Sequence, residues 1–197
     1  MTRRAGVAAL GLALLAPLAL LVLLASCTSA APPSAKARKP SSAPSASAPP
    51  LPAAAIAGGA CLLMDFKVVN DALGSQFDVA GAADKSGTYT CVLQDDSATY
   101  PSLTLSITAT TLAPADFTAS ITPSGSKSVS NLGKIGYVVQ VKATATVGPA
   151  VEVGWLSGND RLIIMRYTFP TDSAASAATA ASNGMTTLAR TVDATTV

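Results

Sequence analysis

The stretch SLTLSITAT, residues 102–110, decides the fold class because apolar and hydroxylated side chains alternate along its whole length. Leu103, Leu105 and Ile107 fall on one side of an extended chain, and Ser and Thr residues fall on the other. This alternation predicts a β-strand with one buried and one solvent-facing side, as in an antiparallel sheet. The apolar side of that sheet must be covered by other elements of the same domain.

Four more strands are expected, over residues 88–93, 137–146, 151–155 and 161–169. Residues 95–101 are expected to form the loop of a hairpin that joins the first of these strands to the stretch at 102–110. The sequence Ser-Gly-Asn-Asp at residues 157–160 is typical of a tight turn, and it predicts a second hairpin. The chain therefore contains about five predicted antiparallel strands.

Three helices are expected around this sheet. The first has Asp65 as its capping residue and Gly74 as its stop. A short helix is expected at residues 113–117. A long one is expected over residues 172–192, where small apolar side chains recur every three or four positions and Gly184 favours a kink or break. We therefore predict an α+β fold, a two-layer domain with an antiparallel sheet of about five strands and helices on one face.

Residues 1–26 have the composition of an export signal, with Arg3 and Arg4 followed by an uncharged apolar run. The sequence LASC, residues 24–27, resembles the lipobox of bacterial lipoproteins, in which a lipid is attached to the cysteine sulfur. The resemblance implies that Cys27 is the lipid attachment site and that cleavage occurs just before it. An uncleaved signal-anchor helix over residues 5–25 is the alternative, since that run is long enough to span a bilayer. The Arg3-Arg4 pair leaves both the Sec and the twin-arginine export routes open.

Residues 27–58 are almost entirely Ala, Pro and Ser, a composition that predicts a flexible stalk. The globular domain is then expected over residues 59–197. All 11 acidic residues, but only eight of the 13 Lys and Arg residues, follow residue 50, so the domain carries a net charge of −3. This charge and the lack of a basic stripe exclude nucleic acid as a partner. We expect the protein on the outer face of the cytoplasmic membrane, attached through its N-terminal lipid.

Two cysteines remain in the expected domain, Cys61 and Cys91. Outside the cytoplasm two cysteines in one small domain normally pair, so we predict a disulfide between them. The alternative is a pair of redox-active thiols, and it lacks the close Cys-x-x-Cys spacing of such sites.

Three short segments resemble a family of actinobacterial lipoproteins that carry a domain of unknown function: Cys-Leu-Leu at residues 61–63, Ala-Leu-Gly at residues 72–74, and Cys91. That family has one cysteine just before its first helix, a second in a strand, and an Ala-rich closing helix. It often has Trp two positions after the second cysteine, where this chain has Leu93. The resemblance implies a sensor-like or binding domain at the cell envelope, and it implies neither a ligand nor catalytic residues.

The sequence contains little that points to catalysis. It has no histidine, which removes the commonest general base and the commonest zinc ligand. Ser124 and Lys127 match the Ser-x-x-Lys pattern of penicillin-binding enzymes, but they lie in a Gly/Ser-rich loop and not at a helix start. Asp95 and Asp96 are adjacent acids before a turn, which is typical of solvated carboxylates. We predict no enzyme active site, no metal and no cofactor.

The remaining candidates for a binding site are Trp155, Tyr137 and Met165, which fall on neighbouring predicted strands. They either belong to the core or line an apolar pocket, between sheet and helices, for a lipid or another small hydrophobic ligand. We therefore predict a non-enzymatic envelope lipoprotein that binds a small apolar ligand or a protein partner. A structural or accessory subunit of an envelope complex and a carboxylate-based hydrolase are the alternatives.

Overall fold

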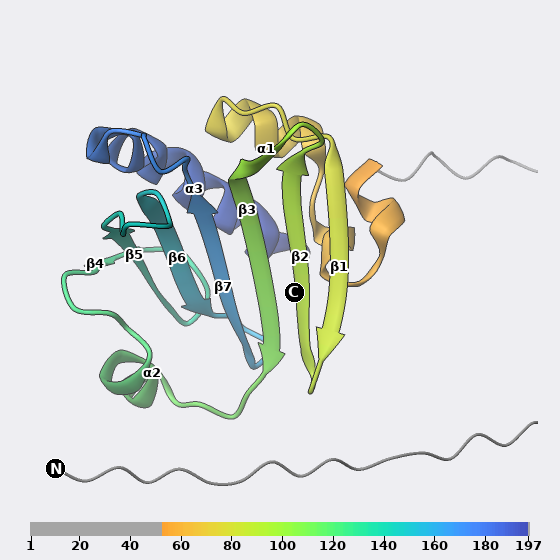
Figure 1. Cartoon of the computed structure of the whole chain (residues 1–197). Helices are drawn as coiled ribbons and strands as arrows, with labels where there is room; N and C mark the ends of the chain where they lie inside the picture. Colours follow the sequence, from red (N-terminus) through yellow and green to blue (C-terminus); the bar gives the residue numbers. More distant parts are fainter. Residues whose placement is uncertain (1–52, 197) are drawn as a thin grey trace, which may run out of the picture. The chain divides into compact units, whose positions relative to one another are not determined.

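The computed structural model describes residues 53–196, which form a seven-stranded antiparallel sheet with helices packed on it (Figure 1). The elements in chain order are η1 (Ala53–Ala57), η2 (Gly59–Leu63), α1 (Phe66–Leu73), β1 (Val79–Lys85), β2 (Thr88–Asp95), β3 (Ala98–Ala109), α2 (Pro114–Ser120), β4 (Lys127–Ser128), β5 (Ile135–Val141), β6 (Ala150–Leu156), β7 (Arg161–Thr168) and α3 (Ala175–Thr195). Both η segments are 3-10 helices. The strand order is β1-β2-β3-β7-β6-β5-β4, so β3 and β7 lie side by side in the sheet although they are far apart in sequence.

The alternating stretch at residues 102–110 forms most of β3, as predicted. Leu103 and Leu105 are fully buried and Ile107 is 3% exposed, whereas the intervening Thr104 and Ser106 are only half-buried. β3 pairs with β2 on one side and with β7 on the other. Hydrogen bonding on both edges and burial on one face therefore hold this strand inside the sheet.

Seven strands are present and not about five. The prediction missed β1, whose sequence VAGAADK contains mostly small residues, and the two-residue β4. β1 is largely exposed and shows no alternation, so its extended form depends on pairing with β2 from Val79–Gln94 to Lys85–Thr88. Such pairing is a tertiary contact that local sequence does not report.

The two faces of the sheet carry separate apolar clusters. The α1/α3 face is covered by α1 and α3, and Met165 of β7 and Met185 of α3 belong to its cluster. α2 lies on the opposite face, the α2 face (Figure 1). There Phe117 packs against Tyr137 and Leu156. The expectation that all helices cover one face is therefore wrong for α2. β5, β6 and β7 are apolar on both sides, so their second side also requires a cover.

The first helix begins and ends where the sequence predicts. Asp65 Oδ1 accepts hydrogen bonds from the backbone N–H groups of Lys67 and Val68, at 2.8 and 3.1 Å, and Gly74 ends the helix in a left-handed conformation. α3, in contrast, continues without a break through Gly184. A Cβ at this position would lie 2.1 Å from the carbonyl oxygen of Ala72, so the glycine allows the end of α1 to contact α3.

The predicted disulfide between Cys61 and Cys91 is present, and both residues are fully buried. It links η2 to β2. Residues 53–58, which we predicted as the end of the stalk, belong to the fold, since Ala54 is fully buried in the cluster of the α1/α3 face. The predicted signal peptide, Cys27 and the remainder of the stalk lie outside the described residues.

Candidate functional site

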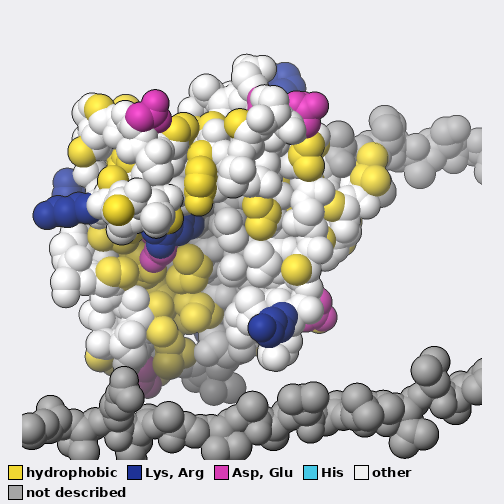
Figure 2. All heavy atoms as spheres, in the orientation of Figure 1, with side chains coloured by type: hydrophobic (Ala, Val, Ile, Leu, Met, Phe, Trp, Pro, Cys, Tyr) yellow, Lys and Arg dark blue, Asp and Glu magenta, His cyan; other side chains and the backbone are white. Residues whose placement is uncertain are grey.

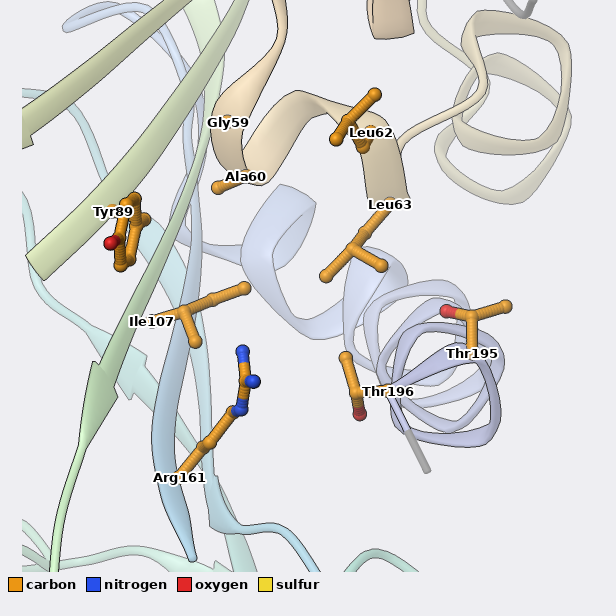
Figure 3. A pocket seen from close by; sticks show the side chains of 9 residues that line it. All are labelled: Gly59, Ala60, Leu62, Leu63, Tyr89, Ile107, Arg161, Thr195 and Thr196. Carbon is orange, nitrogen blue, oxygen red and sulfur yellow. The ribbon is translucent and has the colours of Figure 1, made fainter. Parts of the chain in front are cut away.

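An open groove lies at one end of the α1/α3 face, between η2, the strand ends and the end of α3. We call it the end groove; it is lined by Gly59, Ala60, Leu62, Leu63, Tyr89, Ile107, Arg161, Thr195 and Thr196 (Figure 3). Its volume is about 370 Å³. This volume lies within the range of small-molecule sites in proteins.

The floor of the end groove consists of side chains from three neighbouring strands. Tyr89 on β2 stands directly opposite Ile107 on β3, and Arg161 begins β7 on the other side of β3. All three point to the α1/α3 face. Tyr89 is 46% exposed although Cys91, two residues along the same side of β2, is fully buried. The cover over this face therefore stops between these two residues.

η2 forms the apolar wall of the end groove. Leu63 extends from it toward the space above Ile107, and Leu62 is 58% exposed at the rim (Figure 3). Cys61 lies between Ala60 and Leu62, and its disulfide to Cys91 connects the wall to the strand that carries Tyr89. The disulfide thus sets the position of the wall relative to the floor.

Arg161 is the one charged residue among the residues that line the end groove. Within the described residues its guanidinium takes part in no ion pair, and the neighbouring Asp160 is paired with Lys134. The hydroxyl groups of Thr195 and Thr196 donate to backbone carbonyls of α3. The groove therefore offers an apolar wall, an aromatic ring and a guanidinium whose donors remain available.

A second hollow of about 730 Å³ adjoins the end groove. It shares Tyr89, Ile107 and Arg161 with the groove and extends to Thr111 and Asn159. Because these three shared side chains line both spaces, a ligand longer than the end groove can continue across Ile107 toward the turn before β7.

The three residues predicted to line an apolar pocket do not share one. Trp155 and Met165 belong to the core of the α1/α3 face and are fully buried. Tyr137 points to the α2 face, because it is opposite Gly154 in the β5–β6 pair while its neighbour Gly136 is opposite Trp155. A Cβ on Gly154 would lie 2.6 Å from the Tyr137 ring, so the glycine leaves the space that the ring fills.

The Tyr137 hydroxyl donates to Glu152 Oε1 at 2.7 Å, and Arg166 Nη1 lies 3.5 Å from Glu152 Oε2. Burial, reinforced by the Glu152 carboxylate, raises the pKa of Tyr137 well above its usual range. Around this network the α2 face carries half-buried apolar side chains from Leu112, Ile121, Ile135, Val141, Leu162 and Ile164. Figure 2 shows hydrophobic side chains gathered on this side of the molecule.

The other predicted candidates have ordinary structural roles. Asp95 Oδ1 accepts hydrogen bonds from the hydroxyl and the backbone N–H of Ser97, and these bonds lower the pKa of the Asp95 carboxyl. The backbone N–H of Asp96 donates to Asp78 Oδ1. These acids stabilise the turn between β2 and β3. Ser124 is exposed in a turn before Lys127 of β4, so it does not begin a helix as the penicillin-binding pattern requires.

Comparison with protein-family models, with curated proteins and with solved structures gives no match to this chain. Within residues 53–196 no three His, Cys, Asp or Glu side chains converge as metal ligands. In the same range no helix has the length and hydropathy needed to cross a bilayer.

Leu62, Arg161 and the end of α3 were not predicted as binding-site residues, although all line the end groove. The only local signal was the Leu-Leu pair after Cys61, because two consecutive leucines in a short irregular segment are difficult to bury together. Arg161 carries no such signal, since an arginine at the start of a strand after a turn is ordinarily solvated.

Proposed function

We propose that this chain is a lipid-anchored protein of the bacterial cell envelope and that its domain is a binding module. The end groove is its ligand site, and the ligand has a substantial apolar part. The anchor is supported by the LASC sequence at residues 24–27, and an extracytoplasmic location is supported by the disulfide between Cys61 and Cys91.

One observation carries the binding proposal: Tyr89 and Leu62 are 46% and 58% exposed on opposite sides of one groove. Exposed large apolar side chains that line one concave space are more informative than single ones scattered over a surface. A ligand that covers both removes apolar area from water, which stabilises the complex by roughly 25 cal/mol for each Å².

The test is calorimetric titration of the purified full-length protein with decanol, compared with Leu62→Ser and Tyr89→Ser variants. We expect each substitution to weaken binding several-fold, because it removes part of the apolar contact. Val68→Ser is the matched control, since Val68 is 42% exposed on α1 and lies outside the groove. The N-terminal part is the same in all variants, so differences between them report the groove. Equal affinity in all four proteins would refute the proposal.

An accessory subunit of an envelope complex is the second candidate, and the half-buried apolar side chains of the α2 face favour it. The test places a photo-cross-linking residue at position 162 in cells and, as a control, at position 90 on the polar part of the same face. A defined adduct from position 162 alone would support a protein partner there. The absence of an adduct from position 162 would count against it.

A further inference from the structure

We infer that the end groove binds a single-chain amphiphile with an anionic headgroup, with the head at Arg161 and the chain along Ile107 toward Tyr89 and Leu63. This inference rests on the proposed function and names the ligand class for the same groove. The headgroup chemistry is that of a carboxylate or a phosphate, both of which accept hydrogen bonds from a guanidinium.

The guanidinium of Arg161 can bind an anionic headgroup. Arginine carries five N–H donors and no acceptor, and it stays charged at all relevant pH values. Within residues 53–196 no carboxylate pairs with Arg161, because the adjacent Asp160 is bound by Lys134. The carbonyl of Thr196, at the groove edge, accepts a hydrogen bond from the Asn159 side chain. In Figure 3 the Arg161 side chain extends into the groove, where its donors can meet a ligand.

Charged and apolar groups follow one another in order across the floor of the end groove. β7, β3 and β2 are consecutive in the sheet, so Arg161 and Tyr89 are two strand spacings apart across the sheet, about 10 Å. Arg161 is also displaced by two residues along the strands, about 7 Å, because it is opposite Ala109 while Tyr89 is opposite Ile107. Ile107 lies between them, and Leu63 faces it from η2. The groove is therefore cationic at one end and apolar along its length. An anionic head followed by a hydrocarbon chain matches this order.

Within residues 53–196, the negative groups near the groove do not cancel this charge. The end of α3 contributes a partial charge of about half an elementary charge, which is smaller than the full charge of Arg161. Asp84 is opposite Tyr89 on the outer strand β1, so it lies at the apolar end and away from Arg161. The charge arrangement favours an anionic head at β7 and disfavours one at β1.

The experiment compares decanoate, decyl phosphate and decanol in calorimetric titrations of the full-length protein at low and high salt. We expect at least one anion to bind about twofold to fivefold more tightly than decanol at low salt, the size of an exposed charge pair. High salt should reduce the difference. Arg161→Gln should abolish the preference, and Arg161→Lys should keep part of it. Lys85→Gln is the control, because it removes one positive charge from the face of β1 opposite to Asp84 and Tyr89.

The outcomes separate this inference from the proposed function. Equal binding of decanol and both anions, or an anion preference that survives Arg161→Gln, overturns the anionic head and leaves the apolar groove in place. Failure of all three compounds to bind, or binding that neither Leu62→Ser nor Tyr89→Ser weakens, overturns both. A preference for decanoate alone or for decyl phosphate alone supports the inference and identifies the headgroup.

Discussion

The indole N–H of Trp155 donates to Asp193 Oδ1 at 2.9 Å, which connects the last turn of α3 to the end of β6. The second carboxylate oxygen of Asp193 accepts from the backbone N–H of Gly133, also at 2.9 Å. Trp155 is fully buried, so its N–H requires a partner inside the protein. One carboxylate thus connects α3, β6 and the loop before β5.

Asp193→Ala should lower the free energy of unfolding by about 2 kcal/mol, because it leaves a buried indole N–H without an acceptor. Asp193→Asn should cost less, since its amide oxygen can still accept from Trp155. Urea unfolding followed by circular dichroism measures both. Asp172→Ala is the control at an exposed acid and should change stability by less than about 0.5 kcal/mol. Equal effects of the two alanine variants would contradict the role assigned to Asp193.

Replacing both Cys61 and Cys91 by Ser should destabilise the domain by about 3–4 kcal/mol, the chain-entropy value for a separation of 30 residues. The same change frees η2 from β2, so decanol affinity should also fall. Denaturation and titration with and without dithiothreitol measure the two effects. Dithiothreitol should change neither the stability nor the decanol affinity of the double variant. An effect of dithiothreitol on that variant would show that the loss of the disulfide is not the cause.

Gly184→Ala should be destabilising by about 1–2 kcal/mol, although alanine is the better helix former by about 1 kcal/mol. The reason is the 2.1 Å approach of the new Cβ to the Ala72 carbonyl oxygen, which would push α1 away from α3. Asn183→Ala, on the exposed side of the same helix, should be neutral or slightly stabilising. Thermal unfolding of both variants distinguishes packing from helix propensity, and a stabilised Gly184→Ala would disprove the close contact.

Stability should decline as the pH rises above about 10, the ordinary pKa of tyrosine. Burial raises the pKa of Tyr137 and of Tyr167, so the folded state holds protons that the unfolded chain releases. This contribution is complete below the unfolded pKa and is lost as the pH rises toward the folded one, at most about 1.4 kcal/mol per pH unit for each tyrosine. Urea unfolding between pH 9 and pH 11.5 should show a smaller slope for Tyr137→Phe and for Tyr167→Phe. An unchanged slope in both would refute this assignment.

The lipoprotein proposal predicts the mass of the mature protein. Protein isolated from the membranes of an actinobacterial host should begin at Cys27 and carry a diacylglyceryl group, and its mass should lack two hydrogens because of the disulfide. Cys27→Ser should prevent both cleavage before residue 27 and lipid attachment. Intact-mass spectrometry measures all three features. A species that retains residues 1–26 would favour the signal-anchor alternative.

The sequence by itself determined the elements that depend on interactions between residues close together in the chain. The alternation at residues 102–110 predicts a half-buried strand, and β3 has that pattern of burial. Asp65 begins α1 and Gly74 ends it, because a side-chain cap and a left-handed glycine each act within one turn of helix. The disulfide followed from the number of cysteines and the expected compartment, and these need no knowledge of the fold.

Tertiary structure alone decided the partners of these elements. β1 is a strand only because β2 pairs with it, and Tyr137 faces away from Trp155 because the β5–β6 register places Gly136 opposite Trp155 and Gly154 opposite Tyr137. The end groove likewise joins residues from η2, β2, β3, β7 and α3, which are separated by up to the whole length of the domain. Such contacts depend on strand order and on where each covering element ends. The periodicity of a single segment predicts neither the strand order nor the end of a covering element. Composition and spacing therefore predicted a sheet covered by helices, whereas tertiary packing decided where the groove lies.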